Sequence, residues 1–137
     1  MYLLEHDAKE LLALHGVPVP PGRLIDGDET IHRPALPPGP WMVKGQTFMG
    51  GRGRAGIIRK AGTLQQIVDH ANAILGTMVR GHRINAIRIE QQVTAAEETY
   101  LAFMIDPASC GVRFTDVSVS GIPAARRGSR MEAKDVV

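Results

Sequence analysis

A glycine-rich stretch flanked by basic residues is the part of the sequence best suited to chemistry. It runs Gly51-Arg52-Gly53-Arg54-Ala55-Gly56 and follows Lys44. The string matches G-x-G-x-x-G, but a dinucleotide-binding fingerprint needs a helix directly after the glycines, and residues 57–60 are typical of a strand. A Walker A loop fails as well, because no Gly-Lys-Ser/Thr follows. We therefore predict a loop between two strands, whose backbone N–H groups can contact phosphates while Lys44 and Arg52 supply positive charge.

Two other interpretations of the glycine loop stay open from the residues alone. The loop can be a flexible, solvated hairpin, or it can be a short RGG-like tract. In the second case the chain is a non-catalytic RNA-binding module that also uses the basic tail with Arg126, Arg127 and Arg130. The formal net charge is only +2, which is too small to favour nucleic acid or an anionic membrane as a partner.

Two glutamates form the second candidate group. Glu90 ends one predicted strand and Glu98 begins the next. A strand end followed by a short polar crossing can offer backbone groups to an adenine edge and a carboxylate to ribose hydroxyls. Solvated charges at strand ends are the other explanation for both side chains.

The histidines and the cysteine add no site. The five histidines show no spacing typical of a zinc ligand set, and Cys110 lies in a predicted turn, where we expect an inert thiol. We therefore predict neither a metal site nor a catalytic residue. A single cysteine, no signal peptide and no apolar run near the ~18 residues of a membrane span indicate a soluble, cytoplasmic protein.

The elements that must position these residues follow from periodicity and caps. Leu4, Ala8, Leu11 and Leu12 form the apolar stripe of a first helix. A capping box of Thr63 and Gln66 opens a second helix that Gly76 ends. We expect strands at residues 41–44, 56–60, 87–90, 99–106 and 112–119. The strand at residues 87–90 should be half-buried, because its isoleucines alternate with charged residues. The strand at residues 99–106 should be central in its sheet, because it is apolar on both faces.

This order of elements predicts an α+β fold with a glycine-rich β-hairpin flap and an antiparallel sheet with helices. The proline-rich stretch from residue 26 to 40 should be loop, and the tail from residue 124 shows no clear period.

Three separated motifs, in the same order and spacing, resemble the amino-terminal ATP-grasp region of the β subunit of succinyl-CoA synthetase. The resemblance covers roughly residues 1–119 and extends to malate–CoA ligase and the ATP-citrate lyase group. The motifs are Leu4-Glu5-His6-Asp7-Ala8-Lys9-Glu10-Leu11-Leu12 with residues 15–20, Gly39-Pro40-Trp41-Met42-Val43-Lys44 with Gln46 and residues 50–56, and Ile87-Arg88-Ile89-Glu90 with residues 98–106.

The resemblance implies a nucleotide site and its residues. Lys44 would contact nucleotide phosphates, and the phosphate loop would be lined by Gly51, Arg52 and Gly53. The nucleotide pocket would include Glu90 and Glu98, with Glu98 at the ribose, and Val93 would be at another nucleotide contact, which valine can make through its backbone. The implied activity is an acid–thiol ligase that forms an acyl-CoA from a carboxylic acid, CoA and ATP or GTP with Mg²⁺.

The resemblance also implies a domain organisation. Residues 20–98 would be the small lobe with the glycine flap, and residues 99–137 would begin the second lobe. The magnesium ligands and the CoA-ligase domain would lie beyond Val137, and the phosphorylated histidine would belong to a separate α subunit. We therefore expect the amino-terminal part of such a subunit, inactive by itself.

Overall fold

The computed structural model describes residues 3–27, 36–94, 99–108, 110–118 and 134–136. The chain divides into two compact units, residues 1–93 and 94–137. The predicted Glu98 and most of the basic tail lie outside the described residues.

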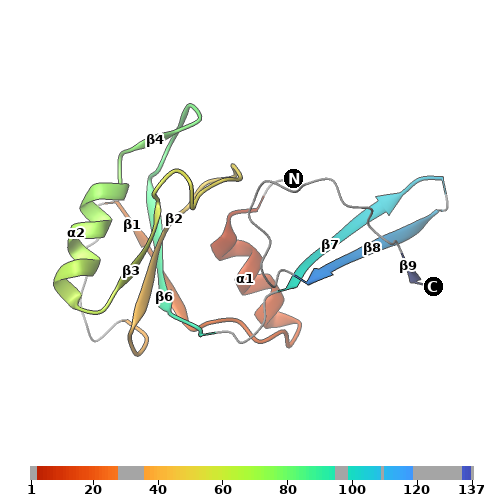
Figure 1. Ribbon diagram of the computed structural model, residues 1–137, viewed down its shortest axis with the longest axis horizontal. Coiled ribbons are helices and arrows are strands. Elements are labelled where there is room, and N and C mark those ends of the chain that lie inside the picture. The colour runs from red at the N-terminus through yellow and green to blue at the C-terminus, as the bar shows by residue number, and fades with distance from the viewer. Residues whose placement is uncertain (1–2, 28–35, 95–98, 109, 119–133, 137) are drawn as a thin grey trace. The chain divides into compact units, whose positions relative to one another are not determined.

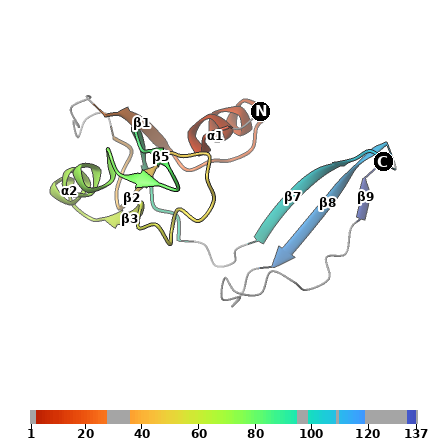
Figure 2. The same ribbon diagram turned by 90° about the horizontal axis from the view of Figure 1, so that it is seen from above.

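The first unit is built around an antiparallel sheet (Figures 1 and 2). Its strands run in the order β1-β6-β2-β3. The elements of this unit are α1 (Glu5–Leu14), β1 (Gly22–Asp26), β2 (Trp41–Gly45), β3 (Ile58–Ala61), α2 (Leu64–Ile74), the short pair β4 (Met78–Val79) and β5 (His82–Arg83), and β6 (Ala86–Gln91).

The core of this unit lies between the sheet and α2, which covers one face of the sheet in Figure 1. Thr63 caps α2 by accepting a hydrogen bond from the backbone N–H of Gln66 at 3.2 Å, as the capping box predicts. The apolar stripe of α2 buries Ile67, Ala71 and Ile74. They pack into one cluster with the inward side chains of the strands and loops, Ile25, Trp41, Val43, Ile57, Ala61, Val79, Ile84, Ile87 and Ile89.

The register of the strands determines which side chains share the face of the sheet that lies opposite α2. Lys44 on β2 pairs with Arg88 on β6, and Met42 pairs with Glu90. Lys44 and Glu90 are therefore diagonal neighbours on one face, within reach of long side chains. Gly22 of β1 pairs with Glu90, and a Cβ at Gly22 would lie 2.7 Å from the Cβ of Glu90. Glycine at position 22 therefore lets β1 lie close to the side chains of Glu90 and Arg88.

The glycine loop joins β2 to β3, which pair with each other in an antiparallel hairpin. Hydrogen bonds from Ala55 N–H to the Gly51 carbonyl and from Gly56 N–H to the Gly53 carbonyl, both 3.1 Å, shape the loop into turns. Gly51 has φ +84°, a conformation that side chains disfavour. No helix begins at these glycines, so the predicted flap is confirmed and the dinucleotide fingerprint is excluded.

The second unit pairs β7 (Thr99–Asp106) with β8 (Gly111–Ser118), and β8 with β9 (Lys134–Val136). The predicted hairpin is therefore present. Within the described strands, however, β7 is at an edge of its sheet, and Phe103, Met104 and Ile105 are exposed. The expectation of a central strand is wrong for this sheet. Apolar residues on both faces of β7 do not by themselves provide a second strand for it to pair with.

Three further expectations need correction. β6 is not half-buried, because Arg88 and Glu90 are 1% and 2% exposed, and the face they occupy is covered by α1 through ion pairs. β1 and the β4–β5 pair were not expected. The tail, for which no element is predicted, contributes β9. No helix within the described ranges is long and apolar enough to cross a membrane.

Candidate functional site

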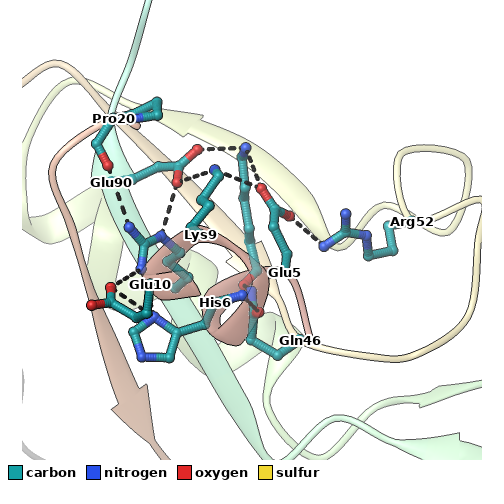
Figure 3. A network of polar contacts seen from close by, with 10 residues as sticks. Glu5, His6, Lys9, Glu10, Pro20, Gln46, Arg52 and Glu90 are labelled. Atoms are coloured by element: carbon teal, nitrogen blue, oxygen red, sulfur yellow. Dashed lines mark hydrogen bonds and ion pairs between the residues drawn. The ribbon is translucent and has the colours of Figure 1, made fainter. Parts of the chain in front are cut away.

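A network of charged side chains that includes Glu5, Lys9, Arg52 and Glu90 occupies the face of the sheet opposite α2 (Figure 3). The Nζ of Lys44 lies 3.0 Å from Oε1 of Glu5 and 2.5 Å from Oε1 of Glu90. Lys9 joins the same two carboxylates, at 2.7 Å from Glu5 and 2.5 Å from Glu90. Helix α1 and the strands β2 and β6 therefore meet at alternating positive and negative groups.

The glycine loop joins this network through Arg52. Nη1 of Arg52 forms an ion pair with Oε2 of Glu5. Glu5 thus bridges Lys44 and Arg52 with its two carboxylate oxygens. The side chains of the three residues are 15%, 18% and 25% exposed for Glu5, Lys44 and Arg52, so the loop cation and the strand cation lie side by side at a partly solvated surface.

Glu90 is the most deeply placed acid of the network, with a side chain only 3% exposed. Besides the two lysines, it accepts a hydrogen bond from Nε of the buried Arg88 at 3.0 Å. Nη2 of Arg88 donates to the Pro20 carbonyl at 3.3 Å, and Nη1 lies 2.5 Å from Nδ1 of His6. Burying these charges is tolerated because they are paired and hydrogen-bonded.

Helix α1 contacts this face of the sheet through its polar side. An amphipathic helix that packs on a core usually turns its apolar side inward instead. Each of its residues remains at least partly exposed, and Leu11, Leu12 and Leu14 point to solvent at 48%, 45% and 82%. Gln46, 4% exposed, fixes the first turn: its Oε1 accepts from the His6 N–H at 3.0 Å and its Nε2 donates to the Lys44 carbonyl at 3.0 Å.

The network holds its groups in their charged forms. Burial raises the pKa of Glu5, but the hydrogen bond from Lys9 and the charge of Lys44 outweigh it and lower the pKa to about 2. Burial also opposes ionisation of Glu90 and Lys44. Hydrogen bonds from Lys44 and Lys9 nevertheless lower the pKa of Glu90, and the contacts with Glu90 and Glu5 raise the pKa of Lys44.

Of the residues predicted for the site, Lys44, Arg52 and Glu90 come together in this network, and Gly51 and Gly53 belong to the loop that carries Arg52. Val93 lies just after β6, is 60% exposed and takes no part in the ion pairs described here. Glu98 is outside the described residues.

Sequence reasoning missed Glu5 and Lys9 as members of the site. Glu5 and Lys9 are four residues apart on α1, and so are His6 and Glu10. The helix therefore carries a charged stripe beside its apolar stripe. The presence of that stripe was visible in the sequence. Its inward orientation was not, because an apolar stripe ordinarily faces the core.

A hollow of about 450 Å³ is also lined in part by the glycine loop. Its lining includes Gly50 and Gly51 and the arginines Arg54, Arg59 and Arg80, but neither Lys44 nor Glu90. The cations of the strand and the loop, Lys44 and Arg52, are brought together by their ion pairs with Glu5 and not by this hollow.

The charged groups of the network fit phosphate recognition by its cations better than metal binding by its carboxylates. Within the described ranges, no three histidine, cysteine or acidic side chains are grouped to hold a metal ion. Glu5 and Glu90 are each engaged by lysine and arginine. A lysine and an arginine next to backbone N–H groups of a glycine loop are, in contrast, a donor set suited to phosphate oxygens.

Comparisons with known proteins identify the family and the fold of the chain. The model of the ATP-grasp domain family matches residues 2–122. A solved structure of ATP citrate lyase from Methanothrix soehngenii, in complex with citrate and coenzyme A, is similar, with a TM-score of 0.75 at 20% sequence identity. The match covers 98% of this chain and 34% of that one, so the chain spans about a third of its relative's length. At this identity the likeness establishes the fold, the α+β amino-terminal region of an ATP-grasp protein.

Proposed function

This chain belongs to the ATP-grasp domain family, and on that basis we propose that it is the nucleotide-binding part of an acid–CoA ligase. The enzyme forms an acyl-CoA from a carboxylic acid, CoA and ATP or GTP. The observation that carries the proposal is the pair of partly buried cations, Lys44 and Arg52, held side by side next to the glycine loop. The sequence motifs support a succinyl-CoA synthetase or malate–CoA ligase type.

The proposed roles follow from charge and position. Lys44 and Arg52 bind phosphate oxygens, and the N–H groups of Gly51 and Gly53 close over them. Glu90, Val93 and Glu98 are assigned to the nucleotide pocket, with Glu98 at the ribose. Since Glu90 already accepts from Lys44, Lys9 and Arg88, its main effect is to hold Lys44 in place.

Activation of the acid explains why a ligase needs this site. A carboxylate is a poor electrophile, so the γ-phosphoryl group of the nucleotide is first transferred through a histidine of a separate α subunit to give an acyl phosphate. The CoA thiol then attacks the acyl carbon and phosphate leaves. Lys44 and Arg52 contribute charge stabilisation and positioning at the γ-phosphoryl group. Bound Mg²⁺ would neutralise phosphate charge, and we place its ligands outside the described residues.

A titration of the purified chain with ATP and with adenosine tests the phosphate role of Lys44. We expect Lys44→Gln to weaken ATP binding by about tenfold or more, the effect of losing one charge-assisted contact, while adenosine binding stays the same. Lys60→Gln is the matched control, because Lys60 is an exposed lysine on the neighbouring strand β3. Equal losses for ATP and adenosine would contradict the proposal.

The RNA-binding alternative makes a different prediction. It requires Arg52, Arg54 and the tail arginines to contact a nucleic acid backbone, with an affinity that falls steeply as salt rises. The ion pair of Arg52 with Glu5 favours the ligase over this alternative. Tight, salt-sensitive binding of a single-stranded RNA, together with no binding of ATP, would reverse that preference.

A further inference from the structure

Glu5 makes the contacts that the proposed function assigns to a nucleotide phosphate. Its Oε1 lies 3.0 Å from Nζ of Lys44, and its Oε2 pairs with Nη1 of Arg52 (Figure 3). A carboxylate and a phosphate accept hydrogen bonds from the same donors in similar geometry. A phosphate that binds between these two cations must therefore take the place of the Glu5 carboxylate.

We infer that Glu5 is an internal stand-in for the nucleotide phosphate: it keeps Lys44 and Arg52 paired in the empty site and is displaced when ATP binds. This inference rests on the proposed function of Lys44 and Arg52. It adds that α1 competes with the nucleotide, so that the affinity for ATP is lower than the two cations alone would give.

The two acids of the network differ in how easily they can leave. Glu90 belongs to β6 in the middle of the sheet, its side chain is 3% exposed, and it is bound by the buried Arg88. Glu5 belongs to α1, which stays at least partly exposed along its length and reaches the sheet through polar contacts. Release of Glu5 therefore disturbs no apolar core. Release of Glu90 would leave the buried Arg88 without its carboxylate partner.

The remaining charges stay compensated after the exchange. Lys9 keeps its 2.5 Å contact with Glu90, and Lys44 and Arg52 gain phosphate oxygens. The freed carboxylate sits in the first turn of α1, where the helix dipole stabilises a negative charge even in water. No group is left buried and unpaired, which makes the exchange a reversible step.

The test compares Glu5→Gln with Asp7→Asn in the full chain by isothermal titration with ATP, inorganic tripolyphosphate and adenosine. Both substitutions remove one negative charge from the first turn of α1, but Asp7 is exposed. We expect Glu5→Gln to bind ATP and tripolyphosphate about fivefold more tightly than wild type, because the phosphate no longer has to displace the ion pairs of Glu5 with Lys44 and Arg52. Asp7→Asn should match wild type, and adenosine should bind all three alike.

Glu5→Asp keeps the inference testable if the glutamine variant folds poorly. The shorter side chain keeps its charge but does not reach both cations, so ATP should again bind more tightly than to wild type. Unchanged or weaker ATP binding to a folded Glu5 variant would overturn the inference and would make Glu5 a positioning residue for Lys44.

Lys44→Gln separates failure of this inference from failure of the proposed function. If ATP binding depends on Lys44 and Glu5 variants bind more weakly, the site is a phosphate site and only the displacement of Glu5 is wrong. If ATP binds neither wild type nor the Glu5 variants, the proposed function and the inference are both wrong.

Discussion

At the scale of single residues, the feature that decides the chemistry is the way Glu5 joins Lys44 and Arg52 while Lys44 also contacts Glu90. Ion pairs of fully exposed side chains contribute little, but these groups are mostly buried and several cations share each acid. The result is a charged site that is organised before any ligand arrives.

Acid sensitivity follows from the lowered pKa values of Glu5 and Glu90. A carboxylate whose pKa is lower in the folded than in the unfolded chain stabilises the fold above the unfolded value and loses that effect as the pH falls. For Glu5 the pKa drops from 4.5 to about 2. We therefore expect the free energy of unfolding to decrease as the pH falls from about 4.5 towards 2.

Urea unfolding of wild type and Glu5→Gln across this pH range measures the effect. The wild type should be the more stable protein above pH 4.5, and the difference should shrink as the pH falls towards 2, because protonated Glu5 resembles glutamine. A stability difference that stays constant over the range would show that Glu5 is not held ionised by its partners.

The sequence predicted three members of this cluster but not its full composition. Lys44, Arg52 and Glu90 follow from the glycine loop, the strand end and the resemblance. Glu5 is far from them along the chain, and only tertiary packing brings it within 3.0 Å of Lys44. The burial of Arg88 was missed for the same reason, since an Ile-Arg-Ile-Glu strand ordinarily has one solvated face.

At the scale of the elements, α1 is a helix held to the sheet by polar contacts. Its first-turn N–H of His6 is satisfied by Oε1 of Gln46, a residue that follows β2. The N-cap residue, Leu4, makes no side-chain cap hydrogen bond, so Gln46 performs the role that a serine or aspartate usually has. This contact ties α1 to the same strand that carries Lys44.

Replacing Gln46 by alanine should loosen α1. We expect a loss of about 1–2 kcal/mol in the free energy of unfolding, because one buried cap and the hydrogen bond to the Lys44 carbonyl disappear. Amide hydrogen exchange at His6 should accelerate more than exchange at Ile67 in α2.

Gln65→Ala is the control, since Gln65 is exposed on α2 and contacts only Asp69 among the hydrogen bonds described here. It should change stability by less than about 0.5 kcal/mol. If Gln46→Ala behaved like Gln65→Ala, α1 would not depend on this cap.

Sequence patterns predicted most of the elements, and the misses have physical causes. The capping box and apolar stripe of α2 are local signals, and local signals fix a helix well. β1 spans only Gly22–Asp26 and precedes a proline-rich stretch, so its strand character depends on pairing with β6. The position of β7 at a sheet edge depends on neighbours that periodicity does not reveal.

At the scale of the whole molecule, the buried apolar cluster among the described residues belongs entirely to the first unit. Its members run from Ile25 to Ile89, and the unit ends at Val93. The α+β class and the flap were predictable from the order of elements, whereas the boundary between the units is a property of packing.

We therefore expect residues 1–93 to fold without residues 94–137. The shortened chain should unfold in urea in one cooperative transition, with the helical circular dichroism signal of α1 and α2. Val43→Asp places a charge at a fully buried core position and should abolish the transition. That result would show that the transition reports unfolding of this core. A shortened chain without a cooperative transition would show that the second unit is needed for folding.

Limited trypsin digestion in the presence of ATP tests the central claim, that the nucleotide phosphates bind at the glycine loop, most directly. Trypsin cleaves after arginine, so Arg52 and Arg54 report on the loop, and the exposed Arg83 in β5 is the internal control. We predict that ATP at a saturating concentration slows cleavage after Arg52 and Arg54 at least about tenfold, with no change after Arg83, and that adenosine does not protect. Cleavage of the loop at the same rate with and without bound ATP would contradict the account.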